Sequence, residues 1–265
     1  MRIGLIATDL GHPVLAATAA LLARRHEVVG VDPAGAAGEL ADVYLLKTHS
    51  PQAFSLAKEL ERRGAPVVNS AAATELCQDR VRMAELARAA DLPFAATRDA
   101  GRLAELADPA YPFVVKSRHS RRHDLVARVD DPARLRELAA RWPDEPVVTQ
   151  PFVPGTGWDQ KLWVIDRQVF AARRRSELAD DQEVPGLGQG WEPPAERAAL
   201  ALRVGEVYGL DIYGVDLLDG PAEPVIVDVN AFPGIRGRPG APEALAALAL
   251  RVAGEHGRAA QGRGR

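Results

Sequence analysis

The clearest pattern in the sequence lies in two short apolar runs, Gly214-Val215-Asp216-Leu217-Leu218 and Val225-Ile226-Val227-Asp228-Val229-Asn230. Their lengths and β-branched residues predict two strands, and the Gly-Pro dipeptide between them predicts a hairpin turn. Because side chains alternate along a strand, Asp228 and Asn230 share one face, and Asp216 on the partner strand is close enough to join them. Carboxylate and amide oxygens suit Mg²⁺ or Mn²⁺. We therefore predict a metal site at Asp216, Asp228 and Asn230.

The alternative is an ordinary hairpin with acids that face solvent. We prefer that interpretation for Asp219 and Glu223, which stand at the turn. Carboxylates clustered among valines would instead repel each other and resist ionisation unless a cation were present. On this hypothesis, replacing Asp228 with Ala abolishes turnover and leaves the fold intact.

Residues 1–72 alternate short apolar runs with helical segments, as in Ile3 to Ala7 and Val43 to Leu46. This order predicts a parallel sheet covered on both faces, in a Rossmann-like lobe. Ligands bind such sheets at the carboxyl ends of the strands. The glycine fingerprint of a dinucleotide site is absent, so a scaffold or substrate lobe is expected. The strand ends carry His12, Lys47, Thr48 and His49.

Two further lobes and a tail follow. Residues 73–150 predict a central lobe rich in antiparallel strands, and residues 151–257 predict a third lobe with two hairpins and a terminal helix. The Gly-rich stretch 180–190 is expected to be a long loop, with closure over substrate as the functional alternative. The Gly/Arg/Gln-rich residues 258–265 are expected to be a disordered tail.

Composition excludes several classes of function. A net charge of −3 gives no global attraction to nucleic acid or to an anionic membrane. Cys77 is the only cysteine, which rules out an internal disulfide and a thiolate zinc site. The amino terminus does not read as a secretion signal, and no apolar run approaches the ~20 residues that span a bilayer. We expect a cytoplasmic protein with a small-molecule substrate, without nucleic-acid or membrane partners, and with a homodimer as the default assembly.

Several motifs in the sequence resemble those of a known family. The hairpin and its continuation, Asp228-Val229-Asn230-Ala231-Phe232-Pro233-Gly234, resemble the metal-binding end of ATP-grasp enzymes. The resemblance covers the chain from about Ala71 to the terminal helix and extends more weakly to the first lobe. It implies an α/β (α+β) ATP-grasp fold, with a Rossmann-like lobe followed by two α+β lobes that clamp ATP. The other landmarks stand in the family's order: Asp79-Arg80, Val114-Val115-Lys116, Thr149-Gln150-Pro151-Phe152-Val153, Asp159-Gln160-Lys161 and Arg173-Arg174-Arg175.

The resemblance also implies roles for individual residues. Arg174 would stabilise the transferred phosphoryl group or the tetrahedral intermediate, and Lys161 would assist catalysis. Gly234 and Arg236 would border the substrate, together with His12 and His49, for which ordinary loop histidines are the default interpretation. The cofactors would be ATP and Mg²⁺ (or Mn²⁺). The expected nucleotide-binding residues are Arg80, Lys116, Gln150, Phe152, Val153, Asp159 and Lys161.

One loop departs from the family. Many ATP-grasp enzymes follow the phosphate-binding lysine with a Gly/Ser-rich loop, whereas this chain has the basic stretch Ser117 to His123. Guanidinium groups bind phosphate bidentately, so we favour a functional role for the cluster at the phosphates or at an anionic substrate. A solvated basic turn is the alternative for any single member.

Two chemistries compete within the resemblance: carboxylate–amine ligation, as in ribosomal-protein glutamate ligases, and phosphorylation of a polyol hydroxyl, as in inositol-trisphosphate 5/6-kinases. Arg80 and Asp228 favour the kinases, while Asp159-Gln160-Lys161 and the absence of a histidine after Phe152 favour the ligases. We choose the ligase, acting on a small molecule or peptide through an acylphosphate, and keep the kinase as the alternative. A nucleotide-binding module without turnover is disfavoured, because every metal and phosphate position has a competent residue.

Overall fold

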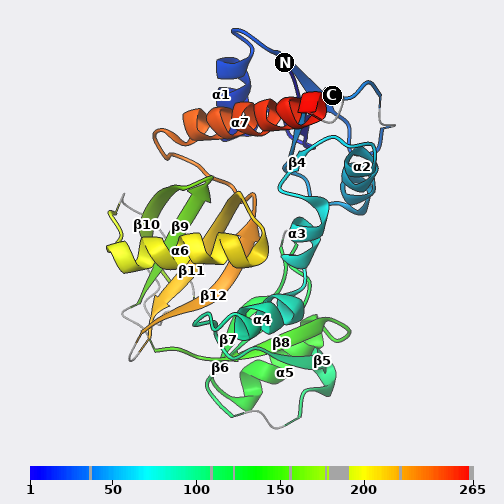
Figure 1. Ribbon diagram of the computed structural model, residues 1–265. Helices are drawn as coiled ribbons and strands as arrows, with labels where there is room; N and C mark the ends of the chain where they lie inside the picture. The colour runs from blue at the N-terminus through cyan, green and yellow to red at the C-terminus, as the bar shows by residue number, and fades with distance from the viewer. Residues whose placement is uncertain are drawn as a thin grey trace.

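Over the residues that the structure, a computed structural model, describes, the fold consists of three four-stranded sheets with helices packed on them. Figure 1 shows the three lobes one above another, with the first lobe at the top and the central lobe at the bottom. This confirms the expected α/β class with a Rossmann-like lobe and two α+β lobes. The structure describes residues 1–35, 38–107, 110–121, 123–154, 157–176, 178, 191–220 and 223–262. The Gly-rich stretch 180–190 lies outside this set.

The first lobe is a parallel sheet in the order β2-β1-β3-β4. Alternation along β1 sends Ile3 and Leu5 to one face and Ile6 to the other, so the sheet is covered on both sides as predicted. The candidate substrate residues His12 and His49 lie in the loops that follow β1 and β3. The elements are β1 (Arg2–Ile6), α1 (Pro13–Leu22), β2 (Glu27–Val31), β3 (Val43–Leu46), α2 (Pro51–Arg62) and β4 (Val67–Val68).

The terminal helix α7 (Ala241–Gly262) returns to the first lobe. Figure 1 shows α7 lying across α1 at the top of the molecule. Its apolar residues Leu245 and Leu248 share one core with Ile3 and Leu15. The same core also contains Trp163 and Ile165 of β9 (Trp158–Ile165), so α7 packs between the first and third lobes. The expectation of a disordered tail is wrong for residues 258–262, which continue α7, since this stretch contains no proline and ends a long helix that is anchored by packing.

The central lobe is an antiparallel sheet in the order β5-β8-β6-β7. Its own core contains Phe113, Val115 and Leu138. Preceding residues such as Met83 and Ala87 pack instead on the third lobe, so the segment before Phe94 bridges the two. The elements are α3 (Ala71–Leu76), α4 (Arg80–Ala89), β5 (Arg98–Arg102), a 3₁₀ turn (Leu103–Glu105), β6 (Phe113–Ser117), β7 (Val126–Val129), α5 (Pro132–Arg141) and β8 (Pro146–Pro151).

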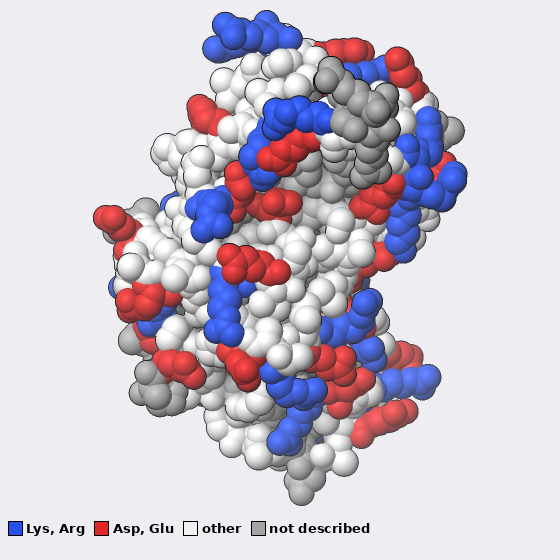
Figure 2. Space-filling view, viewed as in Figure 1, with Lys and Arg blue, Asp and Glu red and all other residues white. Residues whose placement is uncertain are grey.

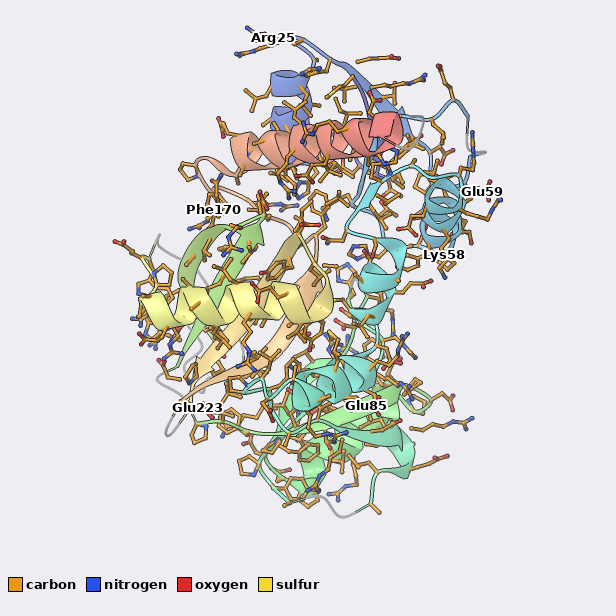
Figure 3. All side chains as sticks on the ribbon, viewed as in Figure 1. Arg25, Lys58, Glu59, Glu85, Phe170 and Glu223 are labelled. Carbon is orange, nitrogen blue, oxygen red and sulfur yellow. The ribbon has the colours of Figure 1, made fainter. Side chains whose placement is uncertain are left out.

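The third lobe is an antiparallel sheet in the order β10-β9-β11-β12, covered on one face by α6. Both predicted hairpins are present. Figure 3 labels Phe170 at the edge of this sheet that faces α7, where it packs on the core shared with the first lobe. The elements are β9 (Trp158–Ile165), β10 (Gln168–Arg175), α6 (Ala195–Tyr208), β11 (Ile212–Asp219) and β12 (Pro224–Ala231).

The surface gives two general findings. Figure 2 shows acidic and basic side chains interspersed over the face in view. Within the described part of the chain, every helix is too short or too polar to cross a bilayer.

Candidate active site

Two aspartates face each other across the β11–β12 hairpin. In the antiparallel register Asp216 lies directly opposite Asp228, and the pairing shifts at a bulge immediately after Asp216. Directly opposite residues have side chains about 5 Å apart, so the two carboxylates share one patch of the sheet. The predicted neighbour Asn230 lies opposite Gly214, farther along the hairpin. The strand pairing thus confirms that the two acids are adjacent.

Cations accompany both carboxylates. Lys161 on β9 contacts both oxygens of Asp216, with its Nζ 3.0 Å from Oδ1 and 3.2 Å from Oδ2. Arg80 donates to Asp228 Oδ2 at 3.0 Å and to Asp124 Oδ2 at 2.8 Å. The Nζ of Lys116 donates to the carbonyl oxygen of Val227 at 2.7 Å, beside Asp228. The charged side chains therefore form one network that ties β6, α4 and the hairpin together.

This network sets the ionisation of its members. Burial by itself raises the pKa of Asp228, but Arg80 and Lys116 more than offset it, and the pKa of Asp228 is lowered from its ordinary value. Burial lowers the pKa of Lys116, and Asp228 counters this only in part. Asp228 is thus held as a carboxylate at neutral pH although it lies in a low-dielectric environment.

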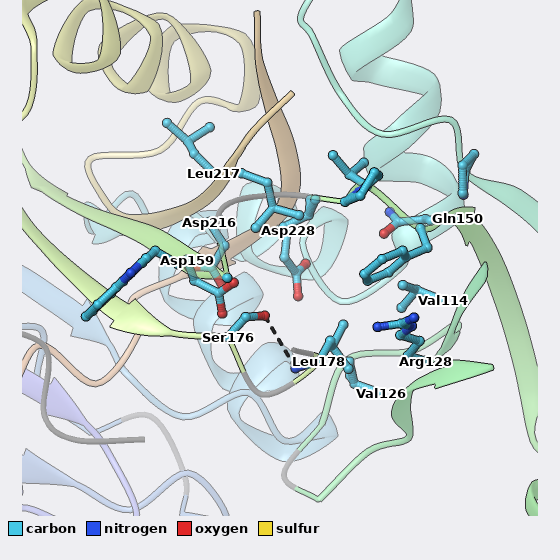
Figure 4. A pocket seen from close by; sticks show the side chains of 18 of the residues that line it. Val114, Val126, Arg128, Gln150, Asp159, Ser176, Leu178, Asp216, Leu217 and Asp228 are labelled. Carbon is cyan, nitrogen blue, oxygen red and sulfur yellow. Dashed lines mark hydrogen bonds between the residues drawn. The ribbon is translucent and has the colours of Figure 1, made fainter. Parts of the chain in front are cut away.

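A cavity of about 990 Å³ opens beside the network, between the central and third lobes. Figure 4 shows the carboxylates of Asp159, Asp216 and Asp228 pointing into it from the third lobe. Strands β6, β7 and β8 of the central lobe form the opposite wall. A volume of this size accommodates a nucleotide-sized ligand.

One end of the wall opposite the carboxylates is largely apolar. Val114 and Val126 line it, and the guanidinium of Arg128 lies 4.1 Å from the ring centroid of Phe152. Gln150 lines the same end, where its Nε2 donates to Thr97 Oγ1 at 2.9 Å. Apolar side chains with a few fixed polar groups suit a flat heteroaromatic ring. The cavity therefore has an apolar end and an anionic end.

Asp159 and Arg174 line the cavity on the edge hairpin of the third lobe. They are paired in the β9–β10 register, with the Nε of Arg174 3.5 Å from Asp159 Oδ2. Arg174 is thus a cation within the cavity wall, directed by an acid on the neighbouring strand. This position fits the role that the resemblance implies for it.

The donor set at the anionic end fits a hard divalent cation. Asp216 and Asp228 supply carboxylate oxygens from opposite positions, and Mg²⁺ commonly takes only one or two carboxylates and completes its shell with water and phosphate. Among the described residues, no three acidic, histidine or cysteine side chains gather as a ready-made metal site. A cation here therefore depends on oxygens from a nucleotide as well as on this pair.

The structure divides the predicted nucleotide ligands into two groups. Arg80 and Lys161 do not line the cavity. Their side chains form ion pairs with Asp228 and Asp216 and are not directed at the space where a phosphate would bind. Asn230 also does not line it. The sequence pattern could not show this, because the contact from Arg80 to Asp228 joins residues far apart in the chain. The predicted nucleotide-binding residues that do line the cavity are Lys116, Gln150, Phe152, Val153 and Asp159.

The basic loop after β6 is largely neutralised by acids. Arg118 pairs with Asp79 at 2.9 Å and with Asp99 at 2.9 Å, and Arg121 pairs with Glu145 at 2.6 Å. These contacts favour a structural role for both arginines, contrary to the expectation that the cluster is a phosphate cradle. Arg122 lies outside the described residues.

The four predicted substrate residues separate into a cluster and an outlier. A Cβ added to Gly234 would lie 3.6 Å from the Nε2 of His12, and Arg236 acts electrostatically on His12. His49 instead lies under α2, stacked on Phe54 with ring centroids 6.3 Å apart. His49 therefore belongs to the packing of the first lobe, while the other three residues converge.

Sequence reasoning missed several residues that line the cavity. Arg128 is one of them, because a single arginine within a strand carries no motif. Ser176 and Leu178 follow β10 and are joined by a hydrogen bond of 3.3 Å, drawn in Figure 4. Only the folding of the hairpin over the central lobe brings these positions to the cavity.

Comparisons with known proteins agree with this geometry. A family model described as a RimK-like ATP-grasp domain matches residues 94–239. A probable alpha-L-glutamate ligase of Thioalkalivibrio sulfidiphilus (strain HL-EbGR7) is 36% identical over 97 residues, which are 34% of this chain and 32% of that protein. The match thus spans about a third of the curated relative.

Solved structures extend the similarity to nearly the whole chain. A RimK domain ATP-grasp protein from Sphaerobacter thermophilus DSM 20745 has a TM-score of 0.73 and 27% identity, covering 94% of this chain and 100% of that one. D-alanine–D-alanine ligase from Bacillus anthracis, complexed with ATP, has a TM-score of 0.72 and 17% identity, covering 96% and 97%. The latter likeness shows the fold alone. Since the family match covers more than half of its residues, the chain belongs to the RimK-like ATP-grasp family.

Proposed function

We propose that the chain is an ADP-forming carboxylate–amine ligase that uses Mg-ATP. One observation carries the proposal: a single cavity between two lobes has an apolar end at Phe152 and an anionic end at the opposed pair Asp216 and Asp228. This arrangement suits a nucleotide base at one end and a metal-bound triphosphate at the other. A cytoplasmic location fits a reaction that consumes ATP. The homodimer expected from the sequence stays a prediction.

The proposed reaction has two balanced steps. A substrate carboxylate oxygen attacks the γ-phosphorus of ATP, the bond to the bridging oxygen breaks, and ADP leaves. An amine nitrogen then attacks the carbonyl carbon of the acylphosphate, loses a proton, and orthophosphate departs as the amide bond forms. A bound Mg²⁺ supplies charge neutralisation on the phosphates in the first step.

The chain's own residues have separate parts in this proposal. Asp216 and Asp228 hold the metal, and the amide oxygen of Asn230 on β12 is the third proposed ligand. Lys116 lines the cavity beside Asp228 and neutralises phosphate charge. Arg174 stabilises negative charge that develops on the transferred group. Arg80 and Lys161 act through the two aspartates and fix their orientation.

The relatives support ligation over phosphorylation of a hydroxyl. The curated relative above is described as a probable alpha-L-glutamate ligase, and the family model that matches this chain is described as a RimK-like ATP-grasp domain. The name of the relative denotes amide-bond formation. We extend that class of reaction, and not its particular substrate, to this chain.

The test follows phosphorus products by ³¹P NMR with Mg-ATP, a panel of carboxylates and a panel of amines. We expect ADP and orthophosphate to rise together only when both partners are present. Hydroxylamine in place of the amine should trap the acylphosphate as a hydroxamate. The Arg174→Gln variant should lower turnover by about 100-fold or more, as for loss of one preorganised charge-stabilising group.

Two results would contradict the proposal. A phosphoester resonance with ADP and without orthophosphate would assign kinase chemistry. Formation of ADP without any hydroxamate, whatever carboxylate is supplied, would exclude an acylphosphate.

A further inference from the structure

A cation, Arg128, stands at the apolar end of the nucleotide cavity, and the reaction proposed above gives it no role. It lies on β7, outside every motif that the sequence resemblance uses. In the antiparallel registers Val114 on β6 is opposite both Arg128 and Gln150. Directly opposite residues share one face of a sheet, so these three side chains form a row. All three line the cavity, and Arg128 therefore belongs to the wall that meets a ligand.

The strand register separates Arg128 from the phosphate end of the cavity. Lys116, which neutralises phosphate in the proposed function, is opposite Val126 in the next row. Side chains on one face of a strand are about 7 Å apart along it, so the two rows are separated by about that distance. Figure 4 shows Arg128, with Val114 and Val126, across the cavity from the three carboxylates. Arg128 thus meets a part of the ligand other than the metal-bound phosphates.

Two contacts hold the guanidinium of Arg128 in place. Its carbon lies over the ring of Phe152, 4.1 Å from the centroid. Its Nε is 2.7 Å from Oδ1 of Asp130, and only 19% of the side chain is exposed. A side chain that is already ordered loses little further freedom when a ligand binds, so its contacts contribute more fully to affinity.

The surroundings of this guanidinium form a slot for an aromatic ring. A guanidinium is planar and stacks on aromatic faces, as Arg128 does on Phe152. Leu218 and Val227 of the third lobe line the same cavity from the other wall. A flat base between the walls would meet a cation on one side and aliphatic groups on the other. Because fused rings attract a cation more strongly than single rings do, this slot favours a purine over a pyrimidine.

Resting on the nucleotide site of the function proposed above, we propose that Arg128 selects the nucleobase. Its guanidinium stacks on the π face of a purine, and Phe152 backs it as a second layer. Lys116 and the aspartate pair bind the other end of the same nucleotide. The contact with Arg128 therefore depends on the base and is independent of the phosphates.

Calorimetry on the full chain with Mg²⁺ tests this without requiring turnover. The probes are ADP, CDP and inorganic tripolyphosphate, which has phosphates and no base. We expect wild type to bind ADP about tenfold more tightly than CDP. Arg128→Met should weaken ADP binding about tenfold and leave tripolyphosphate binding unchanged. A residue that only supported the fold would weaken the binding of both ligands.

The variant Arg128→Lys separates stacking from charge. It keeps the positive charge and loses the planar guanidinium. We expect its affinity for ADP to lie nearer to that of Arg128→Met than to that of wild type. Melting followed by circular dichroism checks that both variants fold.

Arg134→Met is the matched control. Arg134 is an arginine on α5 of the same lobe that pairs with Glu137 at 2.6 Å and does not line the cavity. This variant should bind all three ligands as wild type does.

Several outcomes would overturn the inference. These are equal binding of ADP and CDP by wild type, unchanged ADP binding in the folded Arg128→Met variant, an equal loss of ADP and tripolyphosphate binding, and full recovery in Arg128→Lys. Failure of the ligase proposal looks different. A chain that binds ADP through Arg128 and yet forms no hydroxamate with any carboxylate would retain the base contact and lose the reaction.

Discussion

At the scale of single residues, the site depends on charges that are buried together. Arg80 is 4% exposed and depends on Asp228 and Asp124 for neutralisation. Lys116, which is also buried, has Asp228 as the carboxylate that acts on it most strongly. Asp228 therefore has a structural part in addition to its proposed role at the metal. The sequence pattern suggested only the second role.

Replacing Asp228 with Ala should accordingly affect both stability and activity. Loss of one partner from a buried ion pair typically costs about 3–5 kcal/mol, because the remaining charge stays unpaired. We expect denaturant titration to show a loss of this order, along with loss of ADP formation. The double variant Asp228→Ala, Arg80→Met should regain part of the stability and none of the turnover. A single variant as stable as wild type would contradict this interpretation.

His49 should make the fold sensitive to acid. Burial, and then Lys47, lower the pKa of His49 to about 4, whereas a histidine in the unfolded chain titrates near its ordinary pKa of 6.5. Between these pH values the unfolded chain binds the proton and the folded chain does not, so stability falls as pH falls. The full effect is about 3 kcal/mol. In the His49→Phe variant, the melting temperature should change less between pH 6.5 and pH 4 than in wild type. If both proteins showed the same pH dependence, His49 would not be the source of the acid sensitivity.

At the scale of elements, the strands could be predicted because their signals are local. Strands β11, β12 and β3 fall within a residue or two of the predicted positions. Strand β5 was missed, because its residues Arg98–Arg102 are polar and pair only at the edge of the central sheet. The helical residues before the central sheet are divided into α3 and α4, since Asp79 caps α4 with its side chain.

A glycine within α6 gives a test at this scale. A Cβ at Gly205 would lie 2.6 Å from Cε1 of Tyr213, whose hydroxyl donates to the oxygen of Ala201 at 2.8 Å. Alanine normally stabilises a helix by about 1 kcal/mol relative to glycine. Here overpacking costs about 1–3 kcal/mol. We expect Gly205→Ala to lower the free energy of unfolding, measured by urea titration.

The control is Gly257→Ala in α7, where an added Cβ meets nothing within 4 Å. That variant should be as stable as wild type or slightly more stable. If Gly205→Ala behaved like the control, the close contact with Tyr213 would be disproved.

At the scale of the whole molecule, the first and third lobes form a single packed body. Trp163 and Ile212 of the third lobe share a core with Leu5 and Leu45 of the first. Asn69, which is 1% exposed, joins the two lobes through its side chain. Its Nδ2 donates to the oxygen of Ile212, and its Oδ1 accepts from the backbone N–H groups of Asp211 and Ile212.

Replacing Asn69 with Ala should weaken this junction. The Ile212 carbonyl and two backbone N–H groups would lose their partner, and an unsatisfied buried group costs about 1–3 kcal/mol. We expect a fall of several kcal/mol in unfolding free energy, with faster hydrogen exchange at Asp211 and Ile212. Exchange that stayed as slow as in wild type would show that Asn69 does not hold the lobes together.

The sequence by itself determined most of the strands and placed Asp216 near Asp228, because alternation and turn residues act over a few positions. Five motifs in order also predicted the ATP-grasp fold, which the structure and the comparisons confirm. Only the tertiary structure decided that α7 covers the first sheet, that Arg80 binds Asp228 and that Lys47 meets Phe232. Each of these contacts joins residues far apart in the chain. Such contacts arise from burial and charge pairing in the folded molecule, and a local pattern cannot specify them.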